Sequence, residues 1–356
     1  MTEPASPIDW GRAERVAVAV SARLKAPDDA EDRREPDWNP PITQIEQQIE
    51  DVTGLRSSAG TATVELIDRH TWIRANIDSF RQLLAPVLER WSAKRPRAVT
   101  GMAGKLSGHV AGAEIGVLLG WMSGRVLGQY DLLVGRDDGA GAVYLVGPNL
   151  AAVEQRFGFD PAEFRNWVLV HELTHRAQFT GVPWMRQYFR GLVDESMSFI
   201  DPDPAVLLAG LREAFKDRHG ARQNVHDHGL AGLLAGPEQR AVIDRVGGLM
   251  SLLEGHGDVT MTRAAGLLVP SADRYARVLA ERRRRSNPVS RVLLRLTGME
   301  AKLNQYAAGE RFIHAVESEG GPRMIDTCWE RAEHLPSLDE IRTPSLWLAR
   351  MGVPVA

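Results

Sequence analysis

Apolar residues recur along most of this chain at the three- and four-residue spacing that places them on one face of a helix. The segments with this helical character are 9–24, 43–50, 70–92, 101–127, 183–199 and 204–216. A short apolar run, Val143 to Val146, lies between glycine-rich turns and predicts a strand. We therefore expect a mainly α (α+β) fold, which is a helical domain with a small β-sheet.

One further helix is predicted between residues 160 and 181 from its start and stop signals. Asp160 suits the N-cap, Pro161 suits the first helical position, and Glu163 would complete a capping box. Gly181 and Pro183 then end the helix. One stripe along this helix consists of Phe164, Val168, His171, His175 and Gln178.

Glycine occupies every fourth position from residue 104 to residue 128. A glycine inside a helix costs about 0.5–1 kcal/mol relative to alanine, so the run needs a compensating gain, and close approach of a second helix is the usual one. A membrane-spanning helix is the alternative. Lys105, Glu114 and Arg125 leave an uncharged stretch well short of the length a membrane requires. We expect a buried core helix.

Residues 26–41 are charged and rich in proline, which predicts a flexible linker between the first helix and the rest of the chain. The expected domains are therefore an N-terminal helix with a linker (1–41) and a single domain (42–356).

The strongest chemical signal is the sequence His171-Glu172-Leu-Thr-His175 within the helix predicted from residue 160. Positions i and i+4 share a helical face, so both imidazoles can reach one zinc ion. Glu172 lies one step round the helix and can take a proton from a water on the metal. A helix with two structural histidines and a solvated glutamate is the alternative.

A catalytic zinc site needs a third protein ligand, and the apolar segment 249–261 offers two. Glu254 and Asp258 share a helical face, so Glu254 can bind the metal while Asp258 accepts the outer N–H of a ligand histidine. His256 is the rival ligand, although it lies about 200° from Glu254 on an ideal helix. If His256 is not a ligand, it contacts substrate or is a core histidine.

Hydrolysis of a carbonyl also needs a group that stabilises the developing oxyanion. Tyr306, in a predicted helix, and His256 are the candidates. A buried tyrosine with a structural partner is the alternative for Tyr306.

The composition narrows the class of protein. A net charge of −3 gives no general attraction to nucleic acid or to acidic lipid. The single cysteine, Cys328, excludes an internal disulfide, and a packed thiol is expected there. The N-terminus has no basic and apolar leader, which predicts a cytoplasmic protein without a membrane span. The oligomeric state stays open.

Several longer segments together resemble a known family. They are Ile8-Asp-Trp-Gly-Arg-Ala-Glu, Asp68-Arg-His-Thr-Trp-Ile-Arg, the run from His171 to His175, Met250-Ser-Leu-Leu-Glu-Gly-His-Gly-Asp and Gly298-Met-Glu-Ala-Lys-Leu-Asn-Gln-Tyr. On these, the chain resembles the type 2 zincin-like metallopeptidases of actinobacteria, whose members are labelled hydrolases associated with biosynthesis of a deazaflavin coenzyme. The spacing of Glu254 and Asp258 also resembles the second motif of gluzincins such as thermolysin.

The resemblance implies that residues 42–356 form a zincin-like metallohydrolase domain with a sheet beside the motif helix. By analogy, Val143 to Val146 would be the edge strand that holds an extended substrate. The expected function is a zinc-dependent hydrolase, a metallopeptidase that cleaves a peptide or amide bond with metal-activated water. The alternative is a non-catalytic zinc-binding scaffold or partner-binding protein in a biosynthetic or regulatory complex.

Overall fold

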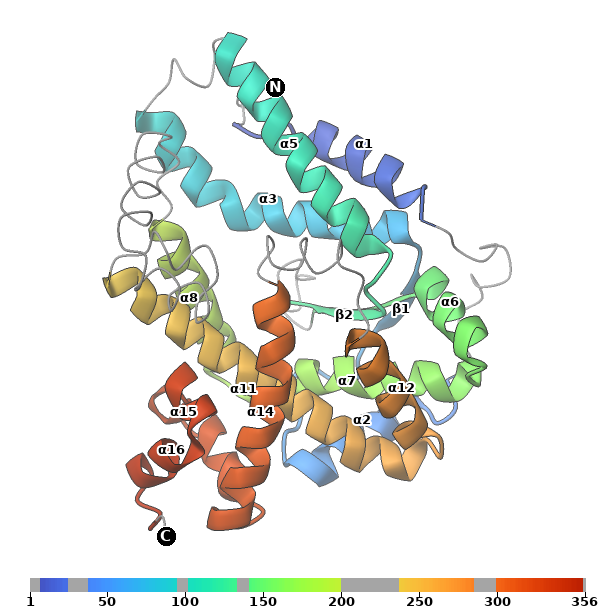
Figure 1. The fold of residues 1–356 in the computed structure, drawn as a ribbon, viewed down its shortest axis with the longest axis vertical. Coiled ribbons are helices and arrows are strands. Elements are labelled where there is room, and N and C mark those ends of the chain that lie inside the picture. The colour runs from blue at the N-terminus through green and yellow to red at the C-terminus, as the bar shows by residue number, and fades with distance from the viewer. Residues whose placement is uncertain are drawn as a thin grey trace. The chain divides into compact units, whose positions relative to one another are not determined.

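The computed structural model of this chain is mostly helical, with one small sheet (Figure 1). It describes residues 7–24, 38–94, 102–132, 141–199, 237–284 and 299–354. The expected mainly α (α+β) fold is confirmed. The expected helix at 204–216 and most of the expected linker at 26–41 lie outside the described residues. The expected domain boundary at residue 41 stays a prediction.

The chain divides into two compact units, Met1–Glu46 with Ser57–Arg176 and Gln47–Arg56 with Ala177–Ala356. We call them the first and the second unit. The helices of the first are α1 (Trp10–Ser21), α3 (Arg69–Lys94), α5 (Met102–Ser123) and α6 (Gly147–Phe157). Those of the second are α8 (Met185–Ser198), α11 (Pro237–Leu268), α12 (Ala272–Arg284), α14 (Met299–Gly320), α15 (Leu338–Arg342) and α16 (Pro344–Arg350), with 3-10 turns η1 (Met324–Trp329) and η2 (Ala332–His334). The chain passes from one unit to the other inside two helices, after Glu46 in α2 (Ile42–Thr53) and after Arg176 in α7 (Pro161–Gly181).

The sheet of the first unit has three strands in the order β1 (Val64–Ile67), β3 (Ala142–Val146) and β2 (Gly128–Asp131). Strand β3 pairs with β1 in parallel and with β2 antiparallel, and Val143 faces Tyr130 across the second pair. Its sequence, Ala-Val-Tyr-Leu-Val, is almost entirely buried, as expected of a central strand.

The predicted strand at 143–146 is therefore confirmed, but its expected position at the edge of the sheet is wrong. It has neighbours on both sides, and the edge strand beside α7 is β2. Strand β2 has the sequence Gly-Gln-Tyr-Asp, which carries no apolar signal, and it follows α5 after a short turn at residues 124–127. Its pairing with β3 makes it a strand, and that pairing joins residues 11 to 17 positions apart.

Helix α5 packs along α1, and the expected role of its glycines is confirmed (Figure 1). A methyl group at Gly112 would lie 2.3 Å from the main-chain oxygen of Asp9, and one at Gly120 would lie 2.5 Å from that of Ala17. Alanine at these positions would therefore drive the two helices apart.

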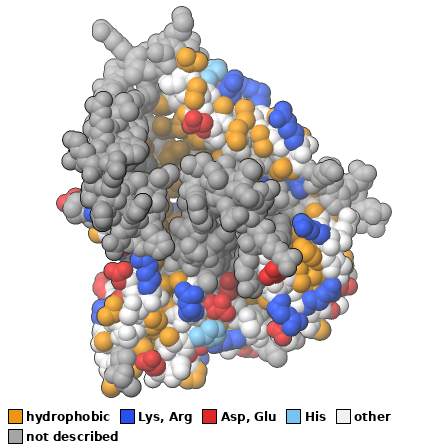
Figure 2. Space-filling model, viewed as in Figure 1, with side chains coloured by type: hydrophobic (Ala, Val, Ile, Leu, Met, Phe, Trp, Pro, Cys, Tyr) orange, Lys and Arg blue, Asp and Glu red, His pale blue; other side chains and the backbone are white. Residues whose placement is uncertain are grey.

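The other face of α5 is more open than a core helix requires. Leu106, Val110 and Val117 are 69%, 51% and 46% exposed, and apolar side chains show on this face in Figure 2. Charged side chains of both signs are mixed among the described residues in the same view. Within the described ranges, no helix is both long and apolar enough to span a bilayer.

One hydrophobic cluster joins α1, α3 and α5 to the sheet. It is formed by Trp10, Ala17, Ile67, Trp72, Ile73, Ile77, Leu119 and Val146. Because these residues come from five elements, the cluster fixes one face of the sheet against the helices. The other face, which carries Val143 and Leu145, is also buried.

The second unit is built around the crossing of α11 and α14. A methyl group at Gly309 would lie 1.9 Å from the main-chain oxygen of Ser251, and one at Gly255 would lie 2.3 Å from the carbonyl carbon of Gly309. Gly255 thus serves helix contact, and α11 runs without interruption from residue 237 to residue 268. The glycines on either side of His256, Gly255 and Gly257, therefore do not interrupt the helix.

The C-terminal helices close this unit. Trp347 is fully buried, meets the Phe312 ring edge-on, and donates from its indole nitrogen to the main-chain oxygen of His334 at 2.8 Å. Cys328 is buried as expected, and burial raises the pKa of its thiol. A neutral, enclosed thiol is unreactive.

Candidate metal centre

Helix α7 begins and ends where its sequence predicts. The Asp160 carboxylate accepts a 2.9 Å hydrogen bond from the amide of Glu163, and the helix runs from Pro161 to Gly181. The preceding helix, α6, ends at Gly158 in the left-handed conformation, with φ of 59°. Glycine adopts this conformation without strain, so the chain can turn sharply into the Asp160 cap.

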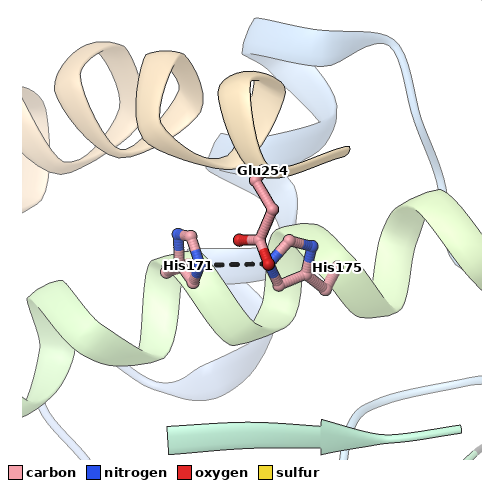
Figure 3. A group of neighbouring side chains, drawn as sticks. All are labelled: His171, His175 and Glu254. Atoms are coloured by element: carbon pink, nitrogen blue, oxygen red, sulfur yellow. Dashed lines mark hydrogen bonds between the residues drawn. The ribbon is translucent and has the colours of Figure 1, made fainter. Parts of the chain in front are cut away.

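The two motif histidines face each other on α7. Their Nε2 atoms lie 3.0 Å apart, and the ring planes are nearly perpendicular at 85°. Figure 3 shows both rings on the same side of the helix. The spacing of one helical turn therefore does what the sequence predicts, which is to present two nitrogen atoms to one point in space.

A buried arginine directly after His175 fixes the orientation of α7 about its own axis. Arg176 is 1% exposed, and its guanidinium binds the Glu46 carboxylate at 2.7 Å and the main-chain oxygens of Ala59 and Gly60 at 3.1 and 2.8 Å. Burial raises the pKa of Glu46, although Arg176 opposes that shift. Since Arg176 is next to His175, its anchoring orients the histidine face of the helix.

The last turns of α7 are anchored to α11 by Gln178. Its side-chain nitrogen donates to the main-chain oxygen of Leu253 at 3.0 Å and lies 3.0 Å from Nδ1 of His256. These three residues all belong to the second unit, whose boundary falls inside α7 after Arg176. Within the second unit, the end of α7 is thus bonded to residues on either side of Glu254.

Glu254 completes a group with the two histidines. One ligand atom from each of His171, His175 and Glu254 lies within 4.8 Å of the others (Figure 3). Glu254 is 5% exposed, so its carboxylate is removed from water. The carboxylate and the two imidazoles point toward one another (Figure 3).

The donor chemistry of this group fits zinc. Two imidazole nitrogens and a carboxylate oxygen are a known set of protein ligands for catalytic zinc, which keeps its remaining position for water or substrate. Two nitrogens bound tetrahedrally at the usual zinc distance lie about 3.3 Å apart, close to the separation of the two Nε2 atoms. His171, His175 and Glu254 are therefore the residues that would hold the ion.

Glu172 lies against the edge strand of the sheet. It is 7% exposed, and its Oε2 accepts a 2.9 Å hydrogen bond from the main-chain amide of Tyr130 on β2. A methyl group at Gly128 would lie 2.7 Å from Cγ and 2.8 Å from Oε1 of Glu172. Gly128, the last of the glycines spaced every four residues, therefore packs against Glu172 instead of against α1.

His256 is not part of the three-residue group. Its ring is 5% exposed, lies edge-on to Trp329 with centroids 5.0 Å apart, and is bonded to Gln178. Asp258 is half-buried on α11, and its predicted bond to a ligand histidine stays a prediction. Tyr306 lies on α14, but its side chain is outside the described residues.

Three residues that organise the centre are not identified by sequence reasoning. Gln178 lies on the histidine stripe of α7, and its position in that stripe is a signal, but the stripe alone assigns it no role. Gly128 reads as one more member of the glycine series. Tyr130 acts through its main-chain amide, which nearly every residue type has, so the sequence does not indicate this role.

The chain is similar to proteins of a known family and to a solved structure. Residues 8–348 match a family described as zincin-like metallopeptidases. No curated protein sequence matches the chain. Among solved structures, it is similar to one described as "a putative hydrolase with a novel fold from Chloroflexus aurantiacus", with 33% identity and a TM-score of 0.70. That match covers 98% of this chain and 100% of the other.

Proposed function

Because this chain belongs to the zincin-like metallopeptidase family, we propose that it is a zinc-dependent hydrolase that cleaves a peptide or amide bond. The observation that carries the proposal is the convergence of His171, His175 and Glu254, with Glu172 next to them on the same helix. Zinc would supply a Lewis acid there, which lowers the pKa of water towards about 7 and polarises a carbonyl oxygen.

The residues of the chain have distinct tasks in this proposal. His171, His175 and Glu254 would hold the ion. The Glu172 carboxylate takes a proton from the attacking water and passes it to the nitrogen of the leaving amine, so that one group serves as base and then as acid. Its burial keeps other water away from this proton transfer.

Further residues are assigned supporting tasks. We propose that Asp258 accepts the outer N–H of a ligand histidine, which would fix the tautomer of that ring. Tyr306 remains the candidate for the oxyanion contact. For His256 a structural task is better supported, since Nδ1 is bonded to Gln178 and the ring packs on Trp329.

The proposed substrate is an extended peptide or a similar amide. Strand β2 lies at an edge of the sheet, so its outward main-chain groups other than the Tyr130 amide, which Glu172 engages, can pair with an extended chain. A cytoplasmic location is proposed as well, because the one cysteine is a buried thiol. The net charge of −3 gives no general attraction to nucleic acid.

The decisive experiment measures zinc and hydrolysis separately. Zinc is determined by elemental analysis of the purified protein, and cleavage of a mixed peptide library is followed by mass spectrometry. Wild-type protein should hold about one zinc per chain and produce new amino termini. Glu172→Gln should keep the zinc and lose at least about 100-fold in rate.

The same experiment tests the alternative of a zinc-binding scaffold. Stoichiometric zinc in the wild-type protein, with no cleavage of any library member, would favour the scaffold over the hydrolase. Equal cleavage by wild type and Glu172→Gln would show that Glu172 has no part in the chemistry. Absence of any transition metal would overturn the zinc proposal itself.

A further inference from the structure

The Glu172 carboxylate lies in a cradle formed by two residues of β2. The amide of Tyr130 donates to Oε2 at 2.9 Å, and the missing side chain of Gly128 leaves the space that Cγ and Oε1 occupy. Both contacts lie within the first unit, together with Glu172 itself.

The hydrogen-bonding pattern of β2 explains why the Tyr130 amide is available. Val146 donates to the main-chain oxygen of Leu127, just before β2. In an antiparallel pair, every second residue bonds to the neighbouring strand, so the residues of β2 that bond to β3 are counted in steps of two from Leu127. Gln129 and Asp131 thus face β3, while the main-chain groups of Gly128 and Tyr130 point outward from the edge. The carboxylate of Glu172 therefore caps one exposed amide of an edge strand.

The strand that forms the cradle is held in place from its opposite side. The Gln129 side chain accepts from the Trp72 indole at 2.7 Å and pairs with the Asn76 amide at 3.3–3.4 Å, both on α3. The turn before the strand is bound by Asn149, whose amide donates to the main-chain oxygens of Ser123 and Val126 at 2.7 and 2.6 Å. These bonds leave β2 little freedom to withdraw from α7.

Any side chain at residue 128 would therefore move Glu172 and not the strand. The atoms that a methyl group would meet, at 2.7 to 3.0 Å, all belong to the outer part of the Glu172 side chain. That part rotates easily, whereas β2 is bonded along its length. Alanine at residue 128 would displace the carboxylate from the Tyr130 amide while the fold persists.

We propose that Gly128 and the main-chain amide of Tyr130 are positioning elements that orient Glu172 for proton transfer. The proposal rests on the proposed function for its catalytic meaning, but the cradle is a property of the fold alone. It assigns the last glycine of the series to the reacting group, while Gly112, Gly116 and Gly120 of α5 pack against α1 or its N-cap residue Asp9.

The cradle is tested without substrate or metal by hydrogen exchange at the Tyr130 amide. The chain has only five tyrosines, so protein labelled with 15N-tyrosine gives few amide signals. Tyr130→Phe, which keeps the main-chain amide, assigns the signal by its disappearance. In Glu172→Ala and in Gly128→Ala, exchange at this amide should accelerate about fivefold or more, because the carboxylate no longer accepts its proton.

Two glycine variants serve as matched controls. A methyl group at Gly191 meets nothing within 4 Å, so Gly191→Ala should leave the Tyr130 exchange rate unchanged. Gly112→Ala disturbs the contact between α1 and α5 and reports any general loosening of the fold. An acceleration in Gly112→Ala equal to that in Gly128→Ala, or no acceleration in Gly128→Ala, would overturn the proposal.

The catalytic consequence is measured on any library peptide that the wild-type protein cleaves. Gly128→Ala should lower kcat about tenfold or more with little change in KM and with unchanged zinc content, since it moves only the base. Unchanged kcat alongside accelerated Tyr130 exchange would refute the positioning role. If the wild type cleaves nothing, the proposed function fails, while the exchange data still decide whether the cradle exists.

Discussion

The side-chain nitrogen of Gln178 lies 3.0 Å from Nδ1 of His256, and it also donates to the main-chain oxygen of Leu253. One amide thus joins the last turns of α7 to the residues on either side of Glu254. The Gln178 nitrogen can only donate, so Nδ1 of His256 accepts in this contact. A histidine engaged in this way is not free to bind a metal through Nδ1.

Replacing Gln178 with leucine should weaken zinc binding about 10- to 100-fold, in the range found for residues that orient ligands. Two hydrogen bonds that fix α11 against the end of α7 would be lost. Competition with a chromogenic chelator measures the affinity. Gln47→Leu, which removes an exposed bond to Asp51, is the control and should bind zinc as the wild type does. Equal affinities in all three proteins would contradict this anchoring role.

Removing the Glu254 carboxylate should lower the affinity for zinc more than removing the His256 ring does. Glu254→Ala loses a proposed ligand, so zinc affinity should fall by more than about 100-fold, which exceeds the effect of residues that only hydrogen-bond to the ligands. His256→Asn should keep stoichiometric zinc. Elemental analysis after dialysis against a weak chelator separates the two variants. Retention of zinc by Glu254→Ala and loss by His256→Asn would reverse the assignment.

Replacing Arg176 with methionine should lower the free energy of unfolding by about 2–4 kcal/mol. The variant leaves Glu46 without its buried partner and two main-chain oxygens without a donor. Urea denaturation followed by circular dichroism measures the change. Arg74→Met, which removes an exposed pair with Glu14, should cost less than about 1 kcal/mol. Similar values for the two variants would show that the buried network is not a special anchor.

Alanine at Gly120 should destabilise the protein by about 1–3 kcal/mol, the usual cost of overpacking. Its methyl group would lie 2.5 Å from the main-chain oxygen of Ala17 and 3.0 Å from the Ala17 Cα. At Gly266 a methyl group meets nothing within 4 Å, so Gly266→Ala should gain about 0.5–1 kcal/mol from helix propensity. Chemical denaturation of both variants checks the signs, and two values of the same sign would count against the packing account.

The C-terminal helices should carry a pH-dependent contribution to stability. Burial alone would raise the pKa of Glu340, but hydrogen bonds from Arg350 and Ser337 outweigh it, and the pKa is lowered. A lowered carboxyl pKa stabilises the fold above the unfolded value and loses that effect as the pH falls through the folded value. Glu340→Gln should therefore cost on the order of 1 kcal/mol at pH 7, with screening included.

The pH dependence itself is the test of that contribution. The difference in unfolding free energy between wild type and Glu340→Gln should shrink as the pH is lowered below about 4.5, where the unfolded carboxyl takes up its proton. Asp339→Asn is the neighbouring control, since its side chain is 85% exposed. A difference that is constant from pH 7 to pH 3 would exclude the ion pair as its source.

Local features of the fold were predictable from the sequence. The Asp160 cap, the end of α7 at Gly181 and the shared face of His171 and His175 each depend on residues within a few positions of one another. Helical periodicity acts over the same range. The glycine series also predicted a close helix partner, because a helix that lacks side chains at a regular spacing gains stability only when another backbone lies against that face.

The sheet was predicted less completely. Only Val143 to Val146 carried the signal of a strand, while β1 and β2 are four residues each and lack an alternating pattern. Their strand conformation follows from pairing with β3 across up to about eighty residues of chain. That pairing also made β3 central and gave the edge to β2.

By itself, the sequence determined which helix carries the metal motif and which residue types surround it, since these follow from spacing along one helix. Only the tertiary structure decided that Glu254 and not His256 joins the two histidines, that Gln178 ties α7 to α11, and that Gly128 and Tyr130 receive Glu172. The physical reason is that each of these relationships is a contact between residues about 40 to 80 positions apart. Such contacts depend on how whole elements pack, and packing is a property of the assembled chain.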